Sequence, residues 1–169
     1  MSISKNKTAL SAAQQDYIEV IYRLEQELGD TDVRISDIAD RLGTRRPTVT
    51  RTVKKLTETG LVDHPTRGGV QLTATGRRIA GEIVHRHDDL VRFLVEILGL
   101  PDRVAQADAG QIEHGLSPAS AQRLHEFLEF FDTLPDAERK PFERFLESVT
   151  GGKADFKHLP RNKTEGWRM

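Results

Sequence analysis

Hydrophobic residues recur at intervals of three and four along most of this chain, which is the spacing of amphipathic helices. The first such stretch begins at Ser11, which forms a capping-box pair with Gln14, and ends at Gly29. Its apolar stripe consists of Tyr17, Val20, Ile21, Leu24 and Leu28. The pattern therefore predicts an N-terminal helix with one buried face.

Two shorter helices are predicted next. Ser36 is the expected N-cap of a helix over 37–42, and Gly43 ends that helix. A third helix is predicted over 46–59, with a proline in its first turn, where the missing N–H is not needed. Its inward-facing positions are Val49, Val53 and Leu56.

The pattern then changes from helix to hairpin and back to helix. Two short apolar runs, 61–64 and 70–72, lie on either side of a glycine-bearing turn and predict a β-hairpin. A long helix over 73–98 follows, and its apolar stripe contains a histidine: Ile79, Ile83, Val84, His87, Val91, Leu94 and Leu98. Further helices are predicted over 102–114, from 117 onward and over 136–149. The order of elements predicts a mainly α fold with one small β-hairpin.

Composition restricts the class of protein. The chain has 169 residues, of which 37% are hydrophobic and 30% charged, values typical of a soluble, helix-rich globular protein. No apolar run approaches the ~20 residues that cross a membrane, and the polar N-terminus is unlike a secretory signal. The sequence contains no cysteine, which excludes disulfides and thiolate ligands. These features favour a cytoplasmic protein without a membrane partner.

Positive charge is concentrated in one part of the chain. Residues 34–78 contain ten Lys or Arg against four Asp or Glu, a net charge of +6; because the whole chain carries −1, the remainder carries −7. Local positive charge is what contacts with DNA phosphates require. A solvated basic helix face is the alternative reading of charge alone.

The order of elements in this basic segment is more specific than its charge. Two helices joined by a short turn around Gly43, the second one basic, followed by a hairpin, are typical of a winged helix-turn-helix. Arg51 is placed to reach a guanine edge, and a basic residue at the hairpin tip can contact the DNA backbone or the minor groove. The predicted DNA-binding residues are Arg45, Arg46, Pro47, Thr48, Thr50, Arg51, Lys54, Lys55 and Arg67. Because one recognition helix gives little specificity, dimers that read a palindromic double-stranded operator are expected.

Candidate metal donors lie before and after the predicted helix-turn-helix and hairpin in the sequence. They are Asp16, Glu19, His87, Glu113 and His114. Each is open to an ordinary reading: a solvated helix face for the first pair, a core histidine, and a histidine that compensates a helix dipole. Together, carboxylates and imidazoles without sulfur suit manganese or ferrous iron, and zinc and copper(II) also bind such donors.

Several strings in the chain resemble one family, the diphtheria-toxin-repressor class of metal-dependent regulators and its manganese transport regulator branch. The matching strings are DYIEVIY at 16–22, SDIA at 36–39, RGGVQLT at 67–73, HRH at 85–87 and IEHGLS at 112–117. The resemblance covers about residues 10–131. It implies a homodimer with an N-terminal winged helix and a helical dimerisation domain, with metal between the two. It also implies that Asp16, Glu19, His87, Glu113 and His114 are the metal ligands.

The chain departs from the family pattern at one position. Manganese regulators usually carry a glutamate three residues before the Glu-His pair, and Gly110 stands there in this chain. Asp108 is about 140° from Glu113 around a helix, so it is badly placed to substitute. The number of ions and the preferred metal are therefore left open by the sequence.

The sequence as a whole predicts a metal-dependent transcriptional regulator, most consistent with a Mn²⁺-responsive repressor of metal uptake genes, and not an enzyme. The predicted domains are a winged helix over 10–75, a helical metal-binding and dimerisation domain over 76–134, and a C-terminal helix and basic tail over 135–169. Two alternatives stay open: a winged-helix repressor with a small organic effector, and a sensor of Fe²⁺ or Zn²⁺. A metallohydrolase is disfavoured because no general base or nucleophile elbow accompanies the metal donors.

Overall fold

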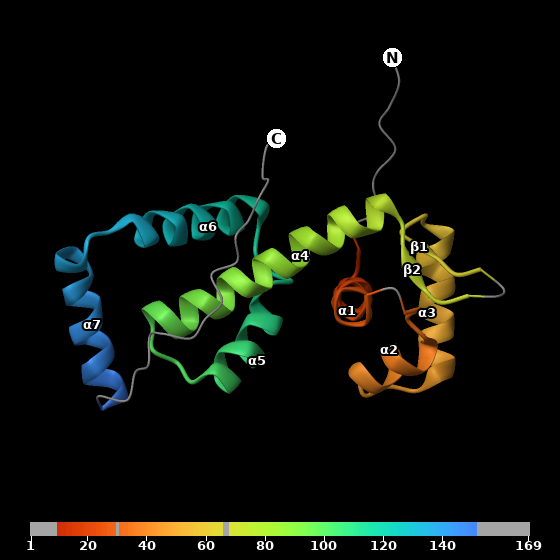
Figure 1. The fold of residues 1–169 in the computed structure, drawn as a ribbon, viewed down its shortest axis with the longest axis horizontal. Helices are drawn as coiled ribbons and strands as arrows, with labels where there is room; N and C mark the ends of the chain where they lie inside the picture. The colour runs from red at the N-terminus through yellow and green to blue at the C-terminus, as the bar shows by residue number, and fades with distance from the viewer. Residues whose placement is uncertain (1–9, 30, 66–67, 152–169) are drawn as a thin grey trace, which may run out of the picture. The chain divides into compact units, whose positions relative to one another are not determined.

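The computed structural model describes residues 10–29, 31–65 and 68–151 of the chain. The chain divides into two compact units, Met1–His85 and Arg86–Met169, and the boundary falls inside the long helix α4 (Ala74–Arg92). Figure 1 shows the elements of both units. No helix among the described residues is long and apolar enough to span a membrane.

The first unit begins with α1 (Ala12–Leu28). The predicted capping box is confirmed, because the Ser11 amide donates to Gln14 Oε1 at 3.0 Å and the Gln14 amide donates to Ser11 Oγ at 3.3 Å. Gly29 ends the helix with a positive φ of 58°. Local sequence chemistry therefore fixes both ends of this helix.

The second helix, α2 (Ile35–Arg41), begins two residues earlier than predicted. The prediction that Ser36 is the N-cap is wrong, because Arg34 holds that position. The Asp37 carboxylate reaches back to accept a hydrogen bond from the Arg34 amide at 2.9 Å, which satisfies an N–H at the helix start. At the other end, Arg41 forms a bidentate pair with Glu27 of α1, and this hydrogen bonding lowers the pKa of the Glu27 carboxyl.

The helix-turn-helix is completed by α3 (Arg46–Glu58), which follows a turn through Gly43. Gly43 has φ +60°, a left-handed conformation that glycine adopts without strain. The three predicted inward residues, Val49, Val53 and Leu56, are fully buried, so the opposite face of α3 is directed to solvent.

The predicted hairpin is confirmed and is short. Strand β1 (Val62–Asp63) pairs antiparallel with β2 (Gln71–Leu72). The first turn of α4 packs closely on the hairpin, because a Cβ on Gly76 would lie 2.0 Å from the Leu61 carbonyl oxygen. The Leu72 amide donates to the Glu25 carboxylate at 2.8 Å. The wing is thus attached to the body of the unit at its base, and its tip at 66–67 lies outside the described residues.

One hydrophobic core holds the first unit together. It joins residues of α1, α2, α3, the hairpin and the start of α4, with Ile18, Ile21 and Ile38 among the fully buried members. Burying side chains of this size stabilises the fold by roughly 1.5–3 kcal/mol each.

The second unit contains the end of α4 and four further elements: η1 (Phe93–Ile97), α5 (Asp102–Ile112), α6 (Pro118–Thr133) and α7 (Asp136–Thr150). The apolar pattern predicts one continuous helix to Leu98, but the last turn, η1, is a π-helix. The wider turn changes which residues face inward, so Ile97 is buried and Leu98 is 40% exposed. The expectation that Leu98 continues the buried stripe is therefore wrong.

Small residues allow α5 to lie close to η1, the turn that follows α4. Ala105 and Ala109 are fully buried against a cluster that includes Leu90, Val91 and Leu94. A second cluster of Ile97, Leu128 and Phe131 joins η1 to α6, and Phe142 of α7 packs against it. The Phe131 and Phe142 rings meet edge to face, with centroids 5.1 Å apart. The predicted helix after Pro135 is thus confirmed as a packed part of this unit.

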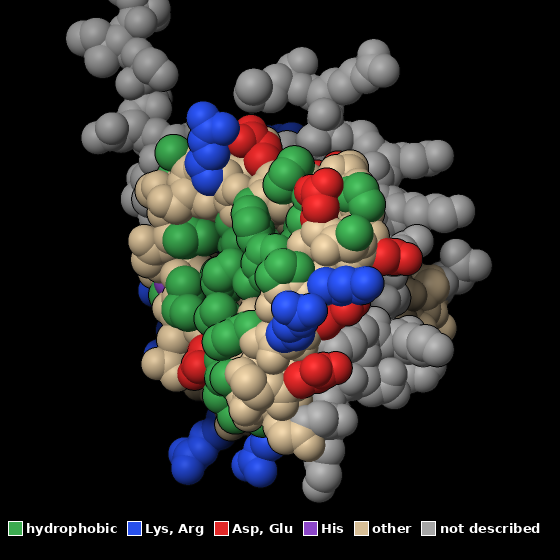
Figure 2. Space-filling view, turned by 90° about the vertical axis from the view of Figure 1, so that its left-hand side faces the viewer, with side chains coloured by type: hydrophobic (Ala, Val, Ile, Leu, Met, Phe, Trp, Pro, Cys, Tyr) green, Lys and Arg blue, Asp and Glu red, His purple; other side chains and the backbone are tan. Residues whose placement is uncertain are grey.

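Hydrophobic side chains also remain on the surface of the second unit. The large ones are Leu98, Val104, Ile112, Phe127, Phe130, Phe145 and Val149. Figure 2 shows hydrophobic side chains gathered in a band on the face that carries α6 and α7. Phe130 is the most exposed of them, at 60%. A contiguous apolar surface of this kind is typical of an interface.

Candidate metal centre and DNA-binding surface

The most unusual side chain in the described part of the second unit is Glu113, the only charged residue there that is buried. Its carboxylate is 2% exposed and lies 2.9 Å from His87 Nδ1. Its backbone carbonyl accepts a hydrogen bond from the Arg86 guanidinium at 3.2 Å. A buried carboxylate is costly unless it is paired, so the imidazole beside it is part of what holds it in place.

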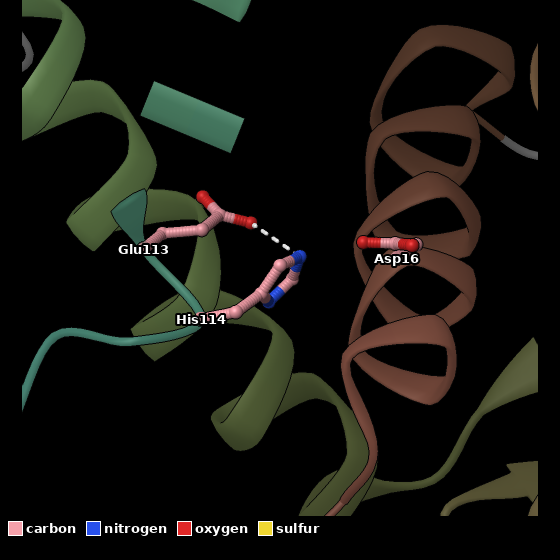
Figure 3. A group of neighbouring side chains, drawn as sticks. All are labelled: Asp16, Glu113 and His114. Carbon is pink, nitrogen blue, oxygen red and sulfur yellow. Dashed lines mark ion pairs between the residues drawn. The ribbon is translucent and has the colours of Figure 1, made fainter. Parts of the chain in front are cut away.

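His114 is the second imidazole near this carboxylate. The sequence pattern predicts a helix over 102–114, but α5 ends at Ile112 and Glu113 is its C-cap. The chain leaves the helix at this point, and His114 Nε2 lies 3.7 Å from Glu113 Oε1, the ion pair marked in Figure 3. The structure therefore brings three of the five predicted donors, His87, Glu113 and His114, together within the second unit.

The other two predicted donors lie on α1 in the first unit. Asp16 and Glu19 are three residues apart and so share one side of the helix. Both are half-buried, and Figure 3 shows the Asp16 carboxylate projecting from the side of α1. The Glu19 carboxylate also accepts a hydrogen bond from Arg23 at 2.8 Å.

The donor chemistry in both units fits a divalent cation. Oxygen and imidazole nitrogen donors without sulfur suit Mn²⁺, Fe²⁺ and Zn²⁺. In the second unit, His87 Nδ1 and Glu113 Oε2 are 2.9 Å apart. Neighbouring donors around a six-coordinate ion with bonds of about 2.1 Å lie about 3 Å apart, so these two atoms are spaced to hold one ion.

Gln106, which is not among the donors predicted from the sequence, places its Oε1 3.1 Å from His87 Nε2. One signal was available, because Gln106 is seven residues before Glu113 and therefore lies on the same face of α5. Gly110 occupies the turn between them. A Cβ built on Gly110 meets no atom within 4 Å, so the position of the missing carboxylate is open space.

All the predicted DNA-binding residues that the structure describes are solvent-exposed. They are Arg45, Arg46, Pro47, Thr48, Thr50, Arg51, Lys54 and Lys55, on or beside α3. None of the five cations among them forms an ion pair with another described residue, so their charge is available to phosphates. The hydroxyl of Thr50 donates to the Arg46 carbonyl at 3.0 Å and keeps its lone pairs free for a partner. Arg67 lies outside the described residues.

The first unit is a winged helix, and the second is a helical unit with a carboxylate–imidazole cluster. Together they define a metal-dependent DNA-binding regulator. Comparison with known families agrees. Residues 9–70 match the N-terminal DNA-binding domain of iron-dependent repressors, and residues 73–142 match their metal-binding and dimerisation domain. The chain belongs to the iron-dependent repressor family.

Individual relatives support the same assignment. The HTH-type transcriptional regulator MntR of Bacillus subtilis is 36% identical over 126 residues, which are 75% of this chain and 86% of the relative. A manganese-dependent transcriptional repressor solved in complex with manganese is similar with a TM-score of 0.63 and 37% identity, over 69% of this chain and 53% of that one. The manganese regulator SloR gives a TM-score of 0.62 and 28% identity, over 69% of this chain and 54% of that one. The chain thus spans about half the length of these two solved chains.

These findings confirm the resemblance to the diphtheria-toxin-repressor class and its manganese-regulator branch. The protein is a metal-dependent, DNA-binding transcriptional repressor that forms a homodimer, and it is not an enzyme.

Proposed function

We propose that this protein represses metal uptake genes in response to Mn²⁺, with Asp16, Glu19, His87, Glu113 and His114 as the metal ligands. The observation that carries the proposal is the buried Glu113 carboxylate with an imidazole on each side. Similarity to manganese-responsive relatives supports Mn²⁺ over the chemically possible Fe²⁺ and Zn²⁺. About one ion per chain is expected, because Gly110 removes a carboxylate that a second ion would need.

The ion supplies a divalent charge that donors on α1, α4 and α5 share. The chain's residues divide the work: Asp16 and Glu19 bind from the DNA-binding domain, proposed over 10–75, and His87, Glu113 and His114 bind from the metal-binding and dimerisation domain, proposed over 76–134. Residues 135–169 add a C-terminal extension, which includes α7. Binding by both domains restricts their relative motion and favours the arrangement that fits DNA. A coupling of about 1–3 kcal/mol raises operator affinity roughly 5- to 150-fold.

The proposed DNA contacts follow from the exposed face of α3. Arg51 reads a base edge in the major groove, while Lys54 and Lys55 contact phosphates. Arg45 and Arg46 contact phosphates at the start of the helix. The remaining contacts are proposed for Pro47, Thr48, Thr50 and the wing residue Arg67. Because the protein is a homodimer, the operator is expected to be a palindrome with two half-sites.

The hydrophobic band on the α6 and α7 face is proposed as part of the dimer interface (Figure 2). Residues 73–142, which match a dimerisation domain, include α6 and the first part of α7. Exposed side chains such as Phe127 and Phe130 are the type that interfaces enrich. A second copy of the chain would remove this apolar surface from water.

Metal-dependent operator binding tests the proposal. Fluorescence anisotropy measures binding to the protein's own upstream region and to metal-uptake promoters, with Mn²⁺, Fe²⁺, Zn²⁺ and a chelator. The expected result is a roughly 5- to 150-fold gain in affinity with Mn²⁺. His87→Ala should abolish that gain. His85→Ala is the matched control, since residue 85 lies about 200° from residue 87 around the helix. Full Mn²⁺ enhancement in His87→Ala would refute the ligand assignment.

A further inference from the structure

Both ring nitrogens of His87 have side-chain partners, and both partners belong to the second unit. Nδ1 lies 2.9 Å from the Glu113 carboxylate, and Nε2 lies 3.1 Å from the amide oxygen of Gln106. The orientation of the imidazole is therefore fixed from two opposite sides. Glu113 belongs to the proposed ligand set, whereas Gln106 has no role assigned so far.

A histidine that binds a metal through one nitrogen needs a hydrogen-bond acceptor for the N–H on the other nitrogen. That acceptor selects the tautomer and stops the ring from turning. The amide oxygen of Gln106 lies 3.1 Å from Nε2 of His87, within reach to accept from an Nε2–H once a metal is bound through Nδ1. With that proton on Nε2, the Nδ1 lone pair is left for the metal, and Nδ1 and Glu113 Oε2, 2.9 Å apart, would bind the same ion.

The choice of glutamine adds a second property. A carboxamide presents an acceptor oxygen and a donor NH₂ group, so a half-turn of the amide lets it pair with either tautomer of a neutral imidazole. Before metal binds, Nδ1–H can donate to the Glu113 carboxylate while the Gln106 amide donates to Nε2. After metal binds through Nδ1, the Gln106 oxygen accepts from Nε2–H. Gln106 can therefore keep the ring in place in both states.

We propose that Gln106 is a positioning residue of the metal site: its side-chain amide holds His87 with Nδ1 facing the ion and adds no charge to the site. This inference rests on the proposed metal-binding function of His87. Gln106 is itself exposed and belongs to no hydrophobic cluster, so its replacement leaves the packing of α5 unchanged.

The first test measures Mn²⁺ affinity by isothermal titration calorimetry on the full chain. Loss of an outer-shell partner typically lowers metal affinity 10- to 100-fold, and Gln106→Ala is expected to lower Mn²⁺ affinity about 10-fold because the residue is exposed. Gln106→Glu keeps an acceptor and makes the imidazole a stronger ligand, so it should bind Mn²⁺ at least as tightly as the wild type. Gln111→Ala and Gln111→Glu are matched controls, because Gln111 is an exposed glutamine on the same helix, about 140° away.

The outcomes separate the positioning role from other effects. Equal affinity of Gln106→Ala and the wild type would overturn the proposal. Equal tightening by Gln106→Glu and Gln111→Glu would show a general charge effect and would also overturn it. If the wild type itself binds no Mn²⁺, the proposed function fails first, which is a distinguishable result.

A second measurement reports the tautomer directly. Zn²⁺ is diamagnetic, so long-range ¹H–¹⁵N NMR correlations of the Zn²⁺-loaded protein can identify the protonated ring nitrogen of His87. We expect Nδ1 bound to metal and Nε2 protonated in the wild type, with the Nε2–H signal broadened by solvent exchange in Gln106→Ala. Metal on Nε2 would contradict the proposal, because that nitrogen is the one Gln106 holds.

Discussion

Replacing Gly110 with glutamate should convert the site from about one ion per chain to about two. The structure allows the change, because Gly110 lies within α5 and a Cβ there meets no atom within 4 Å. The three carboxylates of the proposed ligand set leave a net charge of about −1 with one divalent ion and +1 with two. A fourth carboxylate makes the two-ion state neutral, which removes the electrostatic obstacle to the second ion.

The effect on the metal-free fold is calculable and small. Replacing a helix glycine by a better helix former stabilises by roughly 0.5–1 kcal/mol. A like-charge pair between residue 110 and Glu113 costs about 0.2–0.5 kcal/mol. The free energy of unfolding of Gly110→Glu should therefore lie within about 1 kcal/mol of the wild-type value. Gly110→Ala is the control, because it stabilises the helix without adding a metal-binding side chain. Each kcal/mol of added stability should raise the melting temperature by about 2–4 °C.

The assay is the Mn²⁺ content per chain after equilibrium dialysis, measured by elemental analysis, with Mn²⁺ electron paramagnetic resonance to detect coupling between paired ions. Wild type and Gly110→Ala should agree, and Gly110→Glu should bind about twice as much. If Gly110→Glu binds no additional ion, or if Gly110→Ala already binds two, the reasoning about the missing carboxylate is wrong.

Two further predictions concern the surfaces for DNA and for the second copy. Arg51→Ala should lose about 1–3 kcal/mol of discrimination between operator DNA and DNA with an altered base. Lys55→Ala should weaken binding to all sequences and reduce the salt dependence of binding. Identical profiles of the two variants in competition anisotropy would refute the assignment of Arg51 to a base. Phe130→Glu should raise the dimer dissociation constant at least ~10-fold in sedimentation equilibrium, because a charge would enter an apolar interface. Gln122→Glu, on the same helix, should leave that constant unchanged. A Phe130→Glu chain that remains fully dimeric would place the interface elsewhere.

Helix positions were predictable where the local chemistry offers one solution. Ser11 with Gln14 and Ser117 before Pro118 both start helices as expected. The start of α2 was not, since Ser36 and Asp37 are both capable of capping and the side chain of Asp37 reaches the Arg34 amide. Sequence periodicity alone gives no preference between these two starts, and the choice depends on how α2 packs into the unit.

The π-helix η1 could not be predicted from the sequence for a different reason. Apolar residues at 94, 97 and 98 are compatible with more than one helical period, and packing against α6 selects Ile97 for burial over Leu98. The metal site could not be predicted from its individual residues for a third reason. Each of its residues has an ordinary explanation in isolation, and only the family resemblance connects donors that are far apart in sequence. Gln106 lies outside that pattern, so its contact with His87 became visible only in three dimensions.

The burial of Glu113 has a consequence for how such a sensor can diverge. Substituting this residue would remove the buried carboxylate that pairs with His87 at 2.9 Å, so mutations at the centre of the site are penalised through folding as well as through metal binding. Gln106 and Gly110 lie at the margin of the same cluster, one exposed and the other beside open space. A single substitution at either position can change the charge of the site while the protein still folds. The fold therefore tolerates substitutions that change the charge around the metal at Gln106 and Gly110 better than substitutions of Glu113.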